Sequence, residues 1–216
     1  VLVAGTLGRG AWTLSLAALE CNSPPLNFEF GIPFETRTIA GNNNAYWTLT
    51  SDDQGCSQGN QTGGSGNNAA CSDSILTNLG GFDYNSAMIS NGFDLSAYSA
   101  TDDINLNFAA AFRQENNSNF GVFITTDGGS SWTNILNWDT DHYLPGEDVS
   151  LDLSSFAGQP NVQASFYHLG DNLDGWVQVD DIALECVCFA PAATDLSISY
   201  SGNDALLNWS DTGADV

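Results

Sequence analysis

Apolar and polar residues alternate with a period of two along much of the chain. The clearest runs are residues 26–30, 104–108, 162–166 and 196–200. Because successive side chains of a strand point to opposite faces, this period predicts β-strands with one buried face. Turn-forming pairs such as Gly80-Gly81 and Asn91-Gly92 separate the runs, and no long amphipathic helix is evident. The pattern predicts an all-β, antiparallel two-sheet sandwich.

The alternation changes phase in the last long strand. Val177 and Val179 occupy odd positions before the pair Asp180-Asp181, whereas Ile182 and Leu184 after it occupy even positions. A one-residue change of phase predicts a β-bulge, which re-aims side chains. A carboxylate buried there needs a partner. The alternative is that both acids are solvated at a strand end.

Charge narrows the range of functions. The 216 residues include 26 Asp and Glu but only three basic residues, all arginine, so the formal net charge is −23. This balance excludes binding to nucleic acid or to an anionic membrane, and the absence of lysine excludes Schiff-base chemistry. Hydrophobic residues make up 42 % of the chain, enough to build a core. The scarcity of cations makes a metal ion the favoured partner for buried acids.

The five cysteines predict disulfides and an oxidising compartment, because their spacing matches no zinc site. Cys56 and Cys71 flank a Gly/Asn/Ser-rich loop that a local bridge would close. Cys21 precedes the first strong strand and Cys186 ends the last, so they are the second expected pair. Cys188 then has no assigned partner. The alternative is that some of the five are free buried thiols.

Two shifts in composition divide the chain into three expected domains. The segment NSPP ends the first piece and FAPAAT begins the last. The expected boundaries are 1–20, 21–188 and 189–216. Because the chain starts at Val1 without a signal peptide and stops within a strand pattern, we expect a fragment of a larger secreted protein.

The central domain resembles the MAM-like jelly rolls of secreted bacterial proteins, including cleaved-adhesin domains. The resemblance rests on ordered motifs, namely Phe28-Glu29, Trp47, ISNGFDLS (89–96), TTDGGSSW (125–132), DLSSFAGQ (152–159) and GWVQVDDI (175–182). It implies a concanavalin-like jelly roll and an adhesive, non-catalytic role. It also implies a structural Ca²⁺ ion held by Glu29 with Asp180, Asp181 or both.

Both flanks resemble parts of other extracellular modules. Residues 1–15, with a Gly-Thr-x-Gly-Arg-Gly-x-Trp pattern from Gly5 to Trp12, resemble the closing strands of a BNR, sialidase-like β-propeller. The tail after Cys188, with Leu207 and Trp209, resembles the first strands of a fibronectin type III domain. A complete domain of that type needs about seven strands.

One motif has a structural and a catalytic interpretation. The segment TTDGGSSW fits an Asp-box hairpin, in which Asp127 accepts turn N–H groups, the glycines adopt positive φ and Trp132 packs beneath. A sialidase site would also use such boxes. Three arginines in the whole chain are a poor basis for gripping a sialic carboxylate, so the structural interpretation is favoured.

Aromatic and acidic residues also gather at 138–143. Trp138, Asp139, Asp141 and Tyr143 mix rings with carboxylates, a combination suited to stacking on sugars and accepting hydroxyl protons. They are the candidate ligand-binding residues. The alternative is an exposed turn with incidental aromatics.

The sequence carries no recognised catalytic motif. There is no G-x-S-x-G or H-E-x-x-H, and His168 ends a strand, where a packing or hydrogen-bonding role is common. We therefore predict no enzyme, but a binding or adhesion module of a secreted, cell-surface, multi-domain protein. Its expected partners are a glycan or an extracellular protein surface and its neighbouring modules. The alternatives are an accessory domain of a secreted hydrolase and a structural module of an extracellular filament or surface layer.

Overall fold

The computed structural model describes residues 2–6, 10–14, 28–29, 32, 34–40, 45–76, 84–170, 174–187, 197–201 and 204–208. Regular structure within them is almost entirely β, interrupted by a short 3₁₀ turn at Ser154–Phe156. Across these same residues, no helix has the length and apolar character required to cross a membrane.

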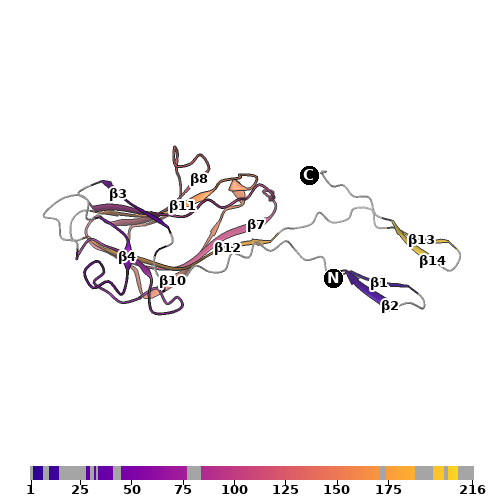
Figure 1. Cartoon of the computed structure of the whole chain (residues 1–216), viewed down its shortest axis with the longest axis horizontal. Helices are drawn as coiled ribbons and strands as arrows, with labels where there is room; N and C mark the ends of the chain where they lie inside the picture. Colours follow the sequence, from indigo (N-terminus) through magenta and orange to yellow (C-terminus); the bar gives the residue numbers. More distant parts are fainter. Residues whose placement is uncertain are drawn as a thin grey trace.

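Two five-stranded antiparallel sheets form the body of the fold, which confirms the predicted jelly-roll sandwich (Figure 1). The first has the order β10-β7-β12-β5-β4, with β10 at His142–Asp152, β7 at Asp103–Gln114, β12 at Gly175–Val187, β5 at Ala70–Asp73 and β4 at Thr48–Leu49. The second has the order β3-β6-β11-β8-β9, with β3 at Glu35–Ala40, β6 at Tyr84–Ile89, β11 at Gln163–Gly170, β8 at Asn119–Thr125 and β9 at Thr133–Trp138.

Apolar side chains from both sheets fill the space between them. Phe108 on β7 packs edge to face against Phe166 on β11, with ring centroids 5.2 Å apart. Val177 and Val179 on β12 are fully buried in the same core. Removing apolar surface from water contributes about 25 cal/mol per Å², so this layer is the main source of stability.

The predicted bulge in β12 is confirmed. Asp180 pairs with Ala109 of β7, and the next pair is Ala183 with Asn107, so two residues of β12 face one of β7. Asp181 has a φ of 49°, in the left-handed region that a non-glycine residue seldom occupies. The change of register lets Ile182 return to the core while Asp180 points to the opposite face of the sheet.

The expected strand over 26–30 is wrong where the structure describes it. Phe28 has no regular structure and Glu29 lies in a turn. Phe28 is nevertheless fully buried and contacts Phe34, with ring centroids 6.3 Å apart. Its apolar character therefore reflects core packing and not strand pairing. Residues 26, 27 and 30 lie outside the described part.

The ends of the chain contain two hairpins. In the first, β1 (Leu2–Thr6) pairs antiparallel with β2 (Gly10–Leu14). In the second, β13 (Ser197–Ser201) pairs antiparallel with β14 (Asp204–Asn208). Their assignment to a propeller and to a fibronectin type III domain, and the boundaries at 20 and 188, remain predictions.

One predicted disulfide is confirmed and the other falls partly outside the described residues. The Cys56–Cys71 bond joins two residues whose Cα atoms are 6.1 Å apart. Cys186 is also disulfide-bonded. Cys21, its predicted partner, and Cys188 lie outside the described residues.

Candidate functional site

A loop between β4 and β5 covers the outer face of β12. The amide of Gln61 donates to Oε1 of Gln178 at 2.7 Å, and Nε2 of Gln178 donates to the carbonyl of Gly59 at 3.1 Å. The Cys56–Cys71 disulfide closes the base of this loop. Residues 56–68, which we name the 56–68 loop, are thus held against the strand that carries the bulge.

The 56–68 loop contacts all three acids that the sequence proposes as calcium ligands. The N–H and hydroxyl of Ser65 both donate to the carboxylate of Asp181 at 2.5 Å. The amides of Asn67 and Asn68 donate to Oε1 of Glu29 at 2.5 and 2.8 Å. The structure therefore gathers Glu29 and Asp181 around one loop, although Glu29 is distant in sequence.

Asp180 occupies the buried side of this cluster, which we name the acid cluster (Glu29, Asp180 and Asp181). Asp180 is 0 % exposed, and its carboxylate accepts from Nδ2 of Asn60 at 3.0 Å and from the N–H of Asp181 at 2.9 Å. Burial, helped by the neighbouring charges of Asp181 and Glu29, raises the pKa of Asp180 to about 6. In the described part of the chain, no ion pair reaches these three carboxylates.

Two glycines allow the loop to approach the acid cluster closely. A Cβ at Gly64 would lie 3.0 Å from a carboxylate oxygen of Asp180 and 3.0 Å from one of Asp181. Gly66 has a φ of 81°, and a Cβ there would overlap the carboxylate of Glu29. This contact therefore requires glycine at these two positions of the loop.

The chemistry of the acid cluster fits a hard cation, because a buried carboxylate without a cationic partner is costly and calcium prefers oxygen ligands. The three acids are not drawn together around one point, however. Within the described ranges, the residues that bring three possible ligand atoms within 4.8 Å of one another are Cys56, Cys71 and Asp73, and not the residues of the acid cluster. The sulfur atoms of that group are joined in the disulfide, so they are not available as metal ligands.

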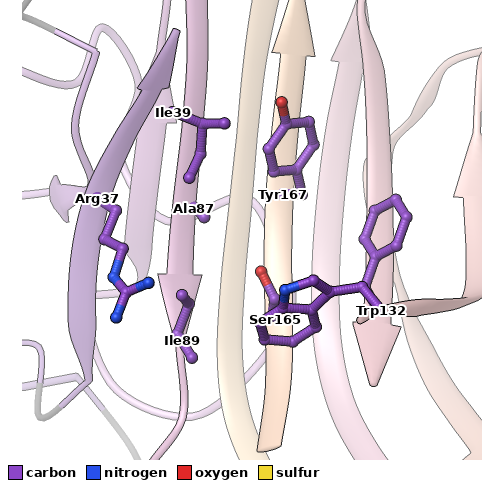
Figure 2. Close-up of a pocket in the computed structure, with 8 residues that line it drawn as sticks. Arg37, Ile39, Ala87, Ile89, Trp132, Ser165 and Tyr167 are labelled. Carbon is purple, nitrogen blue, oxygen red and sulfur yellow. The ribbon is translucent and has the colours of Figure 1, made fainter. Parts of the chain in front are cut away.

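A cavity of about 350 Å³ lies on the outer face of the other sheet (Figure 2). We name it the aromatic groove. Its lining residues are Arg37 and Ile39 on β3, Ala87 and Ile89 on β6, Phe123 on β8, Trp132 after the β8–β9 turn, and Ser165 and Tyr167 on β11. Most of them are apolar or aromatic, on a face where a sandwich usually presents polar residues.

Strand register brings these residues together in two neighbouring rows. In one row Arg37 is opposite Ala87, which is opposite Tyr167. In the next row Ile89 is opposite Ser165, which is opposite Phe123. The rings of Phe123 and Tyr167 pack edge to face with centroids 5.8 Å apart. The floor of the groove is therefore a continuous cross-strand surface.

The two ends of the groove differ in chemistry. At the β3 end, Nε and Nη2 of Arg37 donate to the two carboxylate oxygens of Glu35 at 2.6 and 2.9 Å. At the other end, the indole of Trp132 extends toward the strand that carries Ser165 (Figure 2). Burial raises the pKa of the Tyr167 hydroxyl, so this group stays protonated and able to donate. The groove thus combines rings with several hydrogen-bonding groups.

The predicted ligand-binding residues at 138–143 take part in local packing. Trp138 is 8 % exposed and stacks on His142 with centroids 4.0 Å apart. Tyr143 packs edge to face on Trp176, and Asp141 accepts the N–H of Gln114 at 2.8 Å. Asp139 is exposed. A ligand site at these residues stays a prediction.

Sequence reasoning missed the aromatic groove. A usable signal was present in strands that carry bulky residues on both faces, such as Phe166 with Tyr167 and Val122 with Phe123. Phe166 and Val122 are buried in the core, so the adjacent ring must point outward. Recognising that these outward rings share one groove required the strand order.

Comparisons with known proteins support the fold. No family model and no curated protein matches the chain. Two cleaved adhesin domains of Lys-gingipain from Porphyromonas gingivalis match in structure, each with a TM-score of 0.55. One is 16 % identical and covers 76 % of this chain and 97 % of its own; the other is 19 % identical and covers 76 % and 98 %.

A carbohydrate-binding module solved with β-1,4-galactotriose matches with a TM-score of 0.47 at 12 % identity, covering 76 % of this chain and 98 % of its own. That score is too low to establish a common fold. The adhesin domains share the sandwich architecture, and their low identity extends the likeness no further than the fold.

Proposed function

We propose that this chain is a non-catalytic, glycan-binding module of an extracellular, multi-domain protein, and that the aromatic groove is its binding site. The observation that carries the proposal is the set of outward-facing rings, Phe123, Trp132 and Tyr167, that share one cavity with Arg37, whose guanidinium pairs with Glu35 beside it. A cleaved-adhesin-like sandwich and a disulfide support an extracellular adhesive role.

The groove suits a neutral sugar. The apolar faces of a pyranose stack on aromatic rings, while its hydroxyls need both donors and acceptors. Arg37 and Glu35 supply both in one place and neutralise each other, so they match two adjacent hydroxyls of a sugar. An acidic sugar would also be repelled by the net charge of −23.

A glycan array, followed by calorimetric titration of the glycans that bind, tests this proposal. Trp132→Ala and Tyr167→Ala should each weaken binding about tenfold, which corresponds to about 1.4 kcal/mol. Tyr143→Ala is the control, because Tyr143 packs on Trp176 outside the groove. Binding to no glycan would contradict the proposal. If Tyr143→Ala alone lost glycan binding, the binding site would lie at residues 138–143 and not in the aromatic groove.

A structural calcium ion is the second part of the proposal. Glu29, Asp180 and Asp181 would supply its carboxylate ligands, with backbone carbonyls completing the six to eight oxygens that calcium takes. The carboxylate of Asp180, buried and with no cationic partner among the described residues, supports this assignment. Binding would draw the acid cluster together and fix the 56–68 loop against β12.

Chelation tests the calcium ion. A chelator should lower the thermal midpoint and excess calcium should restore it, because a ligand at about 100 times its Kd stabilises a protein by about 2.7 kcal/mol. Asp180→Asn should abolish this response. Asp53→Asn, an exposed acid of the segment preceding the loop, should keep it. Identical melting curves with and without chelator would refute the ion.

A further inference from the structure

The turn between β8 and β9 is closed by its own side chains. Oδ1 of Asp127 accepts the hydroxyl of Thr125 at 2.7 Å and the N–H of Ser131 at 2.9 Å. Oδ2 of Asp127 accepts the hydroxyl of Ser131 at 2.6 Å. Thr125 in turn accepts the N–H of Gly129 at 3.0 Å. The Asp-box turn bonds predicted from the sequence are confirmed, and both oxygens of Asp127 are engaged inside the turn.

The same turn lies against the ring of Trp132. Gly128 and Gly129 have φ values of 69° and 91°, a conformation that side chains with a Cβ seldom adopt. A Cβ built on Gly129 would lie 3.5 Å from Cζ2 of the Trp132 indole. The indole therefore lies next to the backbone that Asp127 holds in shape, with space for no more than a Cβ between them.

Trp132 differs from the other residues that line the aromatic groove. The seven others belong to β3, β6, β8 or β11, so the hydrogen-bonded ladders of the sheet fix their backbones. Trp132 lies before the first residue of β9 and is outside the strands. Its backbone lies between Thr133, which pairs with Ile124 in the ladder, and the turn that the Asp127 bonds close.

We propose that Asp127 is a positioning residue for ligand binding, which holds the Trp132 indole in place as a stacking surface before the sugar arrives. This inference rests on the proposed function of the aromatic groove. Asp127 acts through Trp132 and does not touch the sugar. A ring fixed in advance loses less conformational freedom on binding, which strengthens the complex.

A ligand-free measurement tests the positioning directly. The protein is labelled with 5-fluorotryptophan, and the fluorine resonance of Trp132, one of six tryptophans, is assigned with Trp132→Phe. Asp127→Ala should shift or broaden that resonance selectively. The control is Asp152→Ala, which removes a similar turn bond, to the N–H of Ser154, in the other sheet. An unchanged Trp132 resonance in Asp127→Ala would overturn the inference.

Affinity supplies the second measurement, with the neutral trisaccharides cellotriose, mannotriose and β-1,4-galactotriose as probes. Asp127→Ala should weaken the binding of the best probe about 5-fold, the effect expected for freeing one bound side chain. Adding Asp127→Ala to Trp132→Ala should cause no further loss. If Asp127→Ala weakened sugar binding equally in the wild type and in Trp132→Ala, the inference would be overturned. Binding of no probe by the wild type, with a selective Trp132 shift, would instead contradict the proposed function and leave the positioning supported.

Discussion

His168 is a polar residue placed entirely inside the sandwich. Its imidazole packs against Tyr84 and Phe112, with centroids 5.2 and 6.4 Å away. Nδ1 lies 3.1 Å from the hydroxyl oxygen of Ser72, and Nε2 is buried without a hydrogen-bond partner in the described structure. The packing role expected for a histidine at a strand end agrees with this environment. The network around Ser72 joins strands from both sheets, so its members could not be identified from the sequence.

Acid should destabilise the protein through His168. Burial lowers the pKa of His168 from 6.5 to about 3. Between these values the unfolded chain binds the proton and the folded protein does not, so the contribution of His168 to stability falls as the pH drops below 6.5, by at most about 1.4 kcal/mol per pH unit. The raised pKa of Asp180 acts in the opposite direction, so the His168 contribution is read from the difference between wild type and variant. Urea unfolding at pH 7 and pH 5 measures this. His168→Gln should change the pH dependence in the direction of greater stability in acid, and the same dependence in wild type and His168→Gln would contradict the mechanism.

At the scale of elements, β12 and the 56–68 loop show what a sequence pattern does and does not determine. The phase change at Asp180 was sufficient to predict the bulge, because alternation is a local property of one strand. The loop has no periodicity, so its contacts with Glu29 and Asp181 were not foreseeable from spacing. Glu29 was proposed as a ligand through resemblance alone, on a strand that the structure replaces with a turn.

The glycines of this loop should differ sharply in their tolerance of a side chain. Gly66→Ala should lower the free energy of unfolding by about 2 kcal/mol, because it strains a positive φ and displaces Glu29. Gly59→Ala is the matched control in the same loop, since a Cβ there would meet nothing within 4 Å. Chemical denaturation compares the two variants with the wild type. Equal effects at both positions would show that the loop is not held against the acid cluster.

At the scale of the whole molecule, the sandwich was predictable and the aromatic groove was not. The alternation within each strand is enough to identify its buried face. Strands that are apolar on one face and joined by tight turns are compatible with few other folds. The groove instead depends on β3, β6, β11 and β8 lying side by side, an order that joins segments far apart in the chain. Arg37 and Tyr167 share it only because both pair with Ala87.

Net charge is the remaining property of the whole chain with a measurable consequence. With 26 acids and three arginines, the folded protein concentrates a charge of −23 and repels itself. Raising NaCl from about 0.01 M to about 1 M shortens the screening length from about 30 Å to about 3 Å, so the thermal midpoint of chelated protein should rise gradually across this range. Calcium should act differently, because a specific binding site saturates at a low calcium concentration. The effect of calcium on the thermal midpoint should also disappear in Asp180→Asn. A midpoint that stays constant or falls as NaCl increases would show that self-repulsion does not limit stability.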